Sequence, residues 1–223
     1  MKILFCGYRD WASEVLFNLE LTFPHVKFAH AYCAEDLTEL VRDNRYDLIA
    51  VVGWSWKIAA DIVDNNIVIG MHPSKLPDYA GGSPIQHQII DGLKESEATL
   101  FRLTAKFDDG PIVASRRYSL EGHIKQVLMS ISEATFQLFV DLINDWPNFE
   151  TRTQLVTNPR RRLKPEHSQL SREQLTSLST RKLWDIIRCR EDPYPNVFIQ
   201  DETGKLTFKL VEFEPNAKDH STR

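Results

Sequence analysis

Short apolar runs alternate with amphipathic segments along the first seventy residues of the chain. The candidate strands are residues 3–7, 26–32, 47–54 and 67–71. The candidate helices between them, with apolar side chains at helical spacing, are residues 10–22, 34–44 and 58–63. The third strand candidate is apolar at successive positions, which fits burial on both faces of a parallel sheet. This succession predicts an α/β fold with a mostly parallel central sheet and right-handed crossovers.

The pattern changes after about residue 80. A helix is expected over residues 83–91, because Pro84 suits its first turn. Two further strands are expected over residues 98–104 and 112–120. A long helix with one broad apolar side follows over residues 123–146, where Trp146-Pro147 ends it.

The chain is less regular beyond about residue 150. Helices are expected over residues 171–178 and 179–190, the second capped by Ser179 or Thr180. A hairpin is expected between residues 193 and 213, with its turn at 201–204. Residues 214–223 are polar and expected to fray. The expected domains are residues 1–150, a linker with helices over 151–192, and a C-terminal hairpin and tail over 193–223.

Composition narrows the class of protein. The 223 residues are 42% hydrophobic and 26% charged with a net charge of −4, which argues against a general nucleic-acid binder. The sequence contains no apolar run of about 18 residues, so no transmembrane helix is predicted. The apolar start at residues 3–7 is too short for a signal peptide and indicates a first strand. Three cysteines, at spacings that suit neither a metal nor a disulfide framework, indicate buried thiols in a cytoplasmic protein.

Chemistry-bearing residues gather where strands end. Trp54, His72 and the 105–110 turn lie at or just past the carboxyl ends of strands, where ligands bind in open α/β sheets. His72 can carry protons near neutral pH, Asp108 can orient it, and Gly110 permits a backbone geometry that a Cβ forbids. A histidine after a strand is often only a surface residue, and such a turn is often only a turn. Spacing alone therefore names no reaction.

An ordered set of motifs adds a family resemblance. The run His72-Pro73-Ser74-Lys75-Leu76-Pro77, then Tyr79, Gly81 and Pro84, then Asp108-x-Gly110-x-Ile112 resembles the 10-formyltetrahydrofolate-dependent formyltransferases. The resemblance covers roughly residues 1–150. A weaker resemblance links the stretch from Arg188 through Pro193-Tyr194-Pro195-Asn196 to Phe198 with the segment that follows the catalytic domain in sugar N-formyltransferases.

The resemblance implies a Rossmann-like formyltransferase domain with 10-formyltetrahydrofolate as co-substrate and no metal. It implies His72 and Asp108 as catalytic residues. The residues implied for folate binding are Ala105, Lys106, Phe107, Asp108 and Gly110. Those expected to bind the acceptor are Trp54, Ser55, Ser74, Tyr79, Gly81, Gly82, Ser83 and Gln86. Trp54, Ser55 and Trp56 are also consistent with core aromatic residues around a polar spacer.

The chain departs from the family pattern at two positions. Gly70 stands where the family's Asn-x-His motif has Asn, and Ala80 stands where an Arg is common. The Asn would help to bind the formyl oxygen, and losing one such donor costs about 10²–10³ in rate. Another hydrogen-bond donor or a water molecule can fill the space of the Asn side chain, and Ser83 and Gln86 are the candidate donors nearest in sequence. Otherwise the enzyme is slow or the site has changed use.

The tail favours one class of acceptor. Too little chain follows the Arg160–Arg162 run for the C-terminal barrel of a transfer-RNA formylase, and a short hairpin resembles the subunit-pairing tails of sugar N-formyltransferases. We therefore expect a homodimer that formylates a nucleotide-linked amino sugar, of a 4-amino-4,6-dideoxyhexose type, for a cell-surface glycan. Arg116, Arg117 or the Arg160–Arg162 run can receive its diphosphate, although for Arg160–Arg162 a solvated charge run is the more common interpretation. The alternatives are a catalytically impaired folate-binding or regulatory homologue, transfer to another small amine, and hydrolysis of 10-formyltetrahydrofolate.

Overall fold

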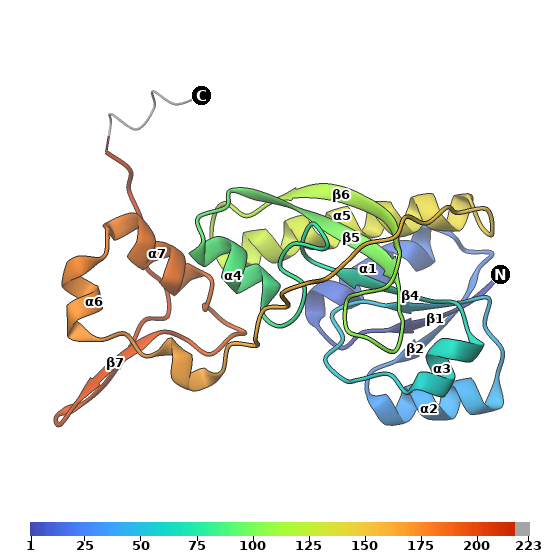
Figure 1. Cartoon of the computed structure of the whole chain (residues 1–223), viewed down its shortest axis with the longest axis horizontal. Coiled ribbons are helices and arrows are strands. Elements are labelled where there is room, and N and C mark those ends of the chain that lie inside the picture. Colours follow the sequence, from blue (N-terminus) through green and yellow to red (C-terminus); the bar gives the residue numbers. More distant parts are fainter. Residues whose placement is uncertain (217–223) are drawn as a thin grey trace.

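A six-stranded sheet forms the centre of the molecule, in the order β2-β1-β3-β4-β5-β6 (Figure 1). The computed structural model describes residues 1–216. The strands are β1 (Lys2–Cys6), β2 (Lys27–Ala31), β3 (Leu48–Val51), β4 (Val68–His72), β5 (Glu95–Arg102) and β6 (Ile112–Ser119). The first four strands pair in parallel, whereas β5 is antiparallel to both β4 and β6. The predicted α/β fold with a mostly parallel sheet is confirmed, with an antiparallel edge added to it.

The helices lie close to their expected positions. They are α1 (Asp10–Thr22), α2 (Ala34–Asp43), α3 (Ala60–Asn65), α4 (Pro84–Ile90), α5 (Ile124–Asn144), α6 (Arg172–Ser177) and α7 (Thr180–Arg188), with a 3₁₀ turn, η1, at Pro165–Ser168. Ser179 caps α7 by accepting a hydrogen bond from the Lys182 amide at 3.2 Å. The third strand is shorter than predicted, because Gly53 has φ +62° and turns the chain away from the sheet.

The two faces of the sheet are covered by different helices. One apolar cluster joins α1 and α5 to the sheet through residues such as Trp11, Leu19 and Phe139. A second cluster joins the other face to α2 and α3 through residues such as Leu37 and Ile62. The length and composition of α5 alone would also suit a membrane span. Its apolar side is buried against the sheet and α1, as in a core helix.

A smaller C-terminal module lies beside this domain (Figure 1). It contains α6, α7 and the two-stranded ribbon of β7 (Phe198–Asp201) and β8 (Gly204–Thr207), around a core that includes Leu170, Ile187 and Val197. The ribbon is shorter than the hairpin predicted for residues 193–213. Val197 is fully buried in the module's core instead. The frayed end expected at 214–223 lies largely outside the described residues.

Buried charges fasten the module to the main domain. Arg188, which is 1% exposed, donates from Nη1 to the Leu120 and Gly122 carbonyls, both at 2.7 Å. Its Nε donates to Asp185 at 2.7 Å. Glu191 accepts a hydrogen bond from the first amide of α5, that of Ile124, at 3.1 Å. These contacts fix the position of the segment that begins at residue 190.

Candidate active site

His72 is the last residue of β4 and lies at the carboxyl end of the parallel strands. Its Nε2 is 3.0 Å from the Tyr79 carbonyl oxygen. A carbonyl can only accept, so Nε2 carries a proton and donates it. Its Nδ1 is 3.5 Å from Asp108 Oδ2, longer than an ordinary hydrogen bond. In the neutral ring Nδ1 is therefore an unprotonated acceptor that faces a carboxylate.

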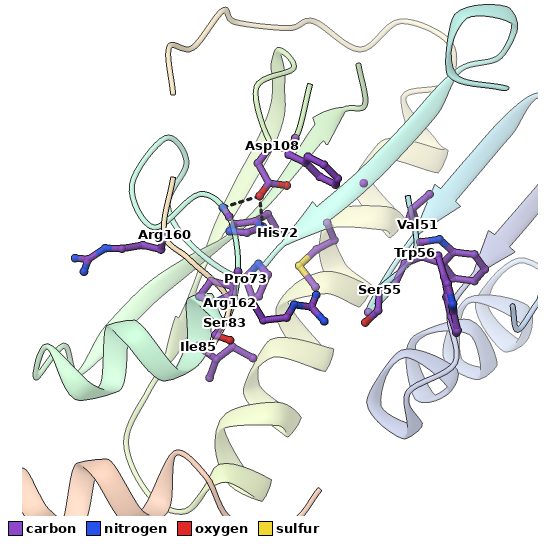
Figure 2. A pocket seen from close by; sticks show the side chains of 18 of the residues that line it. Val51, Ser55, Trp56, His72, Pro73, Ser83, Ile85, Asp108, Arg160 and Arg162 are labelled. Atoms are coloured by element: carbon purple, nitrogen blue, oxygen red, sulfur yellow. Dashed lines mark hydrogen bonds and ion pairs between the residues drawn. The ribbon is translucent and has the colours of Figure 1, made fainter. Parts of the chain in front are cut away.

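Asp108 joins two loops at this point. It lies in the turn between β5 and β6 with φ +51°, and its Oδ2 accepts a hydrogen bond from the Gly81 amide at 2.7 Å (Figure 2). A Cβ on Gly110 would lie 1.7 Å from the Arg102 carbonyl oxygen. That contact is the physical reason for glycine in the Asp-x-Gly sequence of this turn.

Hydrogen bonds from buried side chains fix the loop that follows His72. Ser74 is fully buried and donates to the Asp78 carbonyl at 2.6 Å. The Pro73 carbonyl accepts hydrogen bonds from Tyr118 Oη and Gln88 Nε2, both at 2.8 Å. The backbone that presents His72 is thus fixed by neighbouring strands and by α4.

A segment that the sequence analysis assigned to the linker after the main domain crosses both loops. We call residues 152–164 the crossing segment. Its Gln154 donates from Nε2 to the Asp108 carbonyl at 2.9 Å and to the Gly110 carbonyl at 2.7 Å. Its Arg160 exchanges backbone hydrogen bonds with Ala80 at 2.7 Å and Gly82 at 2.8 Å. The segment therefore fixes the loop of Asp108 and the loop that follows His72 relative to each other.

The close approach of the crossing segment explains the glycine pair. A Cβ on Gly81 would lie 2.4 Å from the Arg160 carbonyl oxygen, and one on Gly82 would lie 2.5 Å from the Arg162 Cα. Backbone packs directly on backbone at both positions. The signal in the sequence was the Gly-Gly pair itself, but its partner eighty residues away could not be identified.

A cavity of about 850 Å³ opens over His72 and Asp108 (Figure 2). The predicted site residues that line it are Trp54, Ser55, His72, Gly81, Gly82, Ser83, Gln86, Ala105, Lys106, Phe107 and Asp108. The structure does not bring three others to the cavity. Ser74 lies beneath the loop, the Tyr79 hydroxyl bonds to Asp91 at 3.0 Å, and Gly110 packs against Arg102.

The position of the missing Asn is filled by an apolar side chain. A Cβ on Gly70 would lie 2.3 Å from Leu103 Cδ1 and 3.3 Å from the Phe101 ring. The two suggested replacement donors line the cavity, and each also makes a hydrogen bond to protein. Ser83 Oγ accepts from the Leu163 amide at 3.0 Å, and Gln86 Nε2 donates to the Cys189 carbonyl at 3.3 Å.

Aromatic side chains form one wall of the cavity. The Trp56 ring lies 4.8 Å from the Tyr8 ring and 4.9 Å from the Trp54 ring, centre to centre. Trp54, Ser55 and Trp56 all line the cavity. Of the two readings that the sequence left open for them, the structure favours the pocket wall.

The cavity is strongly cationic, which sequence reasoning missed. Among the described residues that line it, Asp108 is the single acid, whereas the cations are Arg9, Lys57, Lys106, Arg160, Arg162, Lys164 and Arg190. The Arg160–Arg162 run was the available signal. Arg116 and Arg117 lie elsewhere, on β6, where they pair with Asp141 at 2.9 Å and Glu95 at 3.9 Å.

Residues 20–128 match the family model described as formyl transferase. Among curated proteins, the chain is 28% identical over 160 residues to a methionyl-tRNA formyltransferase of Lysinibacillus sphaericus, covering 70% of this chain and 50% of that protein. It is 41% identical over 68 residues to the methionyl-tRNA formyltransferase of Mycoplasma genitalium, covering 30% of this chain and 22% of that protein. The chain spans about half the length of the curated relatives that it matches over most of its own length.

Solved structures share the fold. A methionyl-tRNA formyltransferase from Clostridium thermocellum superposes with a TM-score of 0.86 at 24% identity, covering 96% of this chain and 94% of that chain. A 4-N formyltransferase from Francisella tularensis gives 0.75 at 18% identity, covering 96% and 98%. HypX from Aquifex aeolicus, in complex with tetrahydrofolic acid, gives 0.73 at 18% identity, covering 90% and 36%. The family-model match at residues 20–128 confirms the resemblance to formyltransferases seen in the sequence over that part of the chain, and the solved structures show that the fold is shared.

Proposed function

We propose that the protein transfers a formyl group from 10-formyltetrahydrofolate to the primary amine of a nucleotide-linked amino sugar. The sugar would be of a 4-amino-4,6-dideoxyhexose type, and the product would serve a cell-surface glycan. The observation that carries the reaction is the His72–Asp108 pair at the cavity, with Nδ1 and Oδ2 3.5 Å apart and both loops held by the crossing segment.

The reaction needs a proton acceptor for the attacking amine. His72 Nδ1 and Asp108 Oδ2 are two acceptors that face each other, so an N–H donor is favoured beside them. His72 Nδ1 takes a proton from the amine nitrogen as the new carbon–nitrogen bond forms. The resulting imidazolium is stabilised by Asp108 on one side and the Tyr79 carbonyl on the other. His72 then returns the proton to the folate nitrogen as its bond to the formyl carbon breaks.

Gly70 changes how the formyl oxygen is stabilised. Leu103 occupies the place of an amide donor, so the charge that develops on this oxygen relies on the His72 imidazolium. Loss of one fixed donor slows such a reaction by about 10²–10³. Proximity of the two substrates in one cavity supplies part of the remaining acceleration.

The cavity wall near Leu103 suits a pterin ring. Val51, Ile58 and Leu103 supply apolar contacts there, and the backbone of residues 104–107 supplies polar groups. A flat heteroaromatic ring needs this combination of apolar faces and a few polar edges. The fit supports 10-formyltetrahydrofolate as the formyl donor.

The acceptor is inferred from the cationic and aromatic lining. Aromatic side chains at Trp54 and Trp56 suit a nucleobase or sugar face, and the surrounding cations suit phosphate oxygens. The net charge of −4 disfavours an extended RNA surface. Formylation of an aminoacylated transfer RNA is the second candidate, favoured by the names of the curated relatives and of the Clostridium thermocellum structure.

A competition between acceptors tests the proposal. The purified chain, supplied with 10-formyltetrahydrofolate, is offered a panel of nucleotide-linked 4-amino sugars and, separately, methionyl-tRNA. We expect formylation of at least one sugar and none of the transfer RNA. Formylated methionyl-tRNA would replace the proposal by the second candidate. Formate release without any acceptor would favour hydrolysis.

We also propose a cytoplasmic homodimer built through the C-terminal module. Leu206 and Leu210 remain 59% and 63% exposed on or beside the β7–β8 ribbon, although Phe208 packs on the module's own core. Exposed apolar ribbons tend to be paired. Light scattering should give a dimer for the natural chain and a monomer for L206D/L210D. A natural chain that is monomeric at micromolar concentration would contradict this part of the proposal.

A further inference from the structure

We infer that Arg9, Arg162 and Arg190 form a subsite for an anionic oxygen group of the acceptor, at the end of the cavity nearest the C-terminal module. The inference rests on the proposed function and specifies where the diphosphate of the acceptor binds. Three segments far apart in the sequence contribute one arginine each, and all three line the same cavity.

Arg162 is fixed at its backbone and extends into the cavity. Its Cα is pressed against Gly82 so closely that a Cβ on that glycine would lie 2.5 Å away, and the next amide donates to Ser83 Oγ at 3.0 Å. In Figure 2 the Arg162 side chain extends toward the space between His72 and Ser55. No carboxylate among residues 1–216 lies within ion-pair distance of it. A guanidinium on a fixed backbone thus reaches the cavity without an acidic partner among these residues.

Arg190 is buried without a compensating acid. Only 7% of its surface is exposed, and among the described residues its side chain makes one hydrogen bond, from Nη1 to the Ile186 carbonyl at 3.4 Å. Within the described part of the chain no acid pairs with it, whereas buried Arg188 pairs with Asp185 at 2.7 Å. Burial of an uncompensated cation is costly. An anionic ligand would supply the missing partner.

Arg9 completes the wall next to Arg190. Its guanidinium lies 5.1 Å from the centre of the Tyr8 ring and 5.8 Å from that of Tyr194. Tyr194 follows Arg190 in the same loop. Within this loop, Asn196 Nδ2 donates a hydrogen bond to the Arg190 carbonyl at 2.9 Å. Ser168, just beyond the crossing segment, donates to the Pro195 carbonyl at 2.9 Å. This contact joins the segment of Arg162 to the loop of Arg190 around one rim.

The neighbours of Arg162 provide a contrast. Arg160 also borders the cavity, but its guanidinium pairs with Asp91 at 3.0 Å and stacks on Tyr79, and Figure 2 shows it extending away from His72. Arg161 is exposed and does not line the cavity; its backbone carbonyl faces His87 at 2.9 Å. Three successive arginines therefore differ in direction, and the middle one is a matched control for Arg162.

Two ligands could bring the anionic group, because both the acceptor diphosphate and the glutamate tail of the folate carry negatively charged oxygens. We assign the subsite to the acceptor because Arg190 and Tyr194 lie in one loop of the C-terminal module and Arg9 contacts the Tyr194 ring, whereas the loop 104–107 expected to hold the pterin joins β5 to β6. Bidentate contact between guanidinium and phosphate oxygens suits this group.

Calorimetric titration of the full chain distinguishes the two sources. The probes are dTDP, UDP, inorganic pyrophosphate and, in a separate arm, 5-formyltetrahydrofolate. We expect at least one diphosphate probe to bind the natural chain, with a Kd raised about tenfold or more in R162Q and R190Q. R161Q should change it less than about twofold. Melting temperatures report whether R190Q folds, because Arg190 is buried. Arg162 is exposed, so we do not expect R162Q to destabilise the fold.

Each outcome decides the inference separately from the proposed function. Equal diphosphate binding by R161Q and R162Q, or no diphosphate binding by the natural chain, overturns the subsite. Weakened 5-formyltetrahydrofolate binding with unchanged diphosphate binding reassigns the arginines to the folate and also overturns it. The transfer assay with amino sugars, run on the natural chain, tests the proposed function whichever result the titration gives.

Discussion

The two ends of the cavity are built in opposite ways. At the end that holds His72 and Asp108, the two loops are held in place by hydrogen bonds within the protein, through Tyr79, Gly81 and the crossing segment. At the other end, Arg162 and Arg190 have no acidic partner among the described residues. The difference suggests that the first end is preorganised for chemistry and that the second awaits a ligand. Changes at the first end should therefore alter kcat, and changes at the second should alter acceptor binding.

Removal of His72 or Asp108, the proposed catalytic side chains, should have the largest effect. H72A and D108A are each expected to lower kcat by about 10³-fold or more, because proton transfer and its stabilisation are lost together. His72 lies at a strand end and contributes no large core volume, so H72A should keep its melting temperature. Turnover near that of the natural chain in a folded H72A protein would show that the assigned chemistry is wrong.

Gln154 should act as a positioning residue. Q154A removes both hydrogen bonds to the Asp108 and Gly110 carbonyls, so we expect kcat to fall about 10–100-fold with little change in acceptor KM. Leu155 is the matched control, because its exposed side chain makes L155A a neutral change in the same segment. Equal kinetics for Q154A and L155A would mean that the crossing segment does not position Asp108.

Substitution of Gly70 tests the end of the cavity that holds His72 and Asp108, because Leu103 packs against this glycine. In G70N the new side chain must displace Leu103, so we expect kcat and melting temperature both to fall, with kcat lower by about tenfold. The double variant G70N/L103A frees the space and should recover activity above G70N. A faster single variant would show that Leu103 moves aside easily and that the absence of Asn limits the natural rate.

The smallest expected effect concerns the joint between the module and the main domain. Glu191, 2.7 Å from His123 Nδ1, raises the pKa of that imidazole above its ordinary 6.5. A raised folded pKa stabilises the fold fully below the unfolded pKa, and that stability is lost as pH rises through the folded value. The melting-temperature difference between the natural chain and H123Q should be greatest below about pH 6.5 and shrink at higher pH. A difference that grows with pH would contradict this coupling.

The sequence predicted what depends on local pattern. Strands, helices, the Ser179 cap and the ordered motif around His72 follow from apolar spacing, turn residues and short-range sequence. It did not predict contacts between distant segments. Leu103 against Gly70, Gln154 against the Asp108 turn, and Arg162 against Gly82 each join residues that only the tertiary fold brings together.

Two expectations failed for physical reasons of the same kind. Ser74 stands beside His72 in the motif, but its hydroxyl turns inward to hold the Asp78 carbonyl. The apolar residues predicted as one long hairpin divide, because Val197 is needed in the core of the module and only β7 and β8 extend as a ribbon. The apolar pattern of the sequence indicates that these residues are buried, but it does not indicate which part of the molecule buries them.

We propose that His72, paired with Asp108, catalyses formyl transfer to the amine of a nucleotide-linked sugar. Mass spectrometry of the acceptor after incubation with 10-formyltetrahydrofolate tests it most directly. We expect a formylated sugar amine with the natural chain and none with H72A under identical conditions. Formylation of methionyl-tRNA alone, or the same sugar product from H72A, would contradict it.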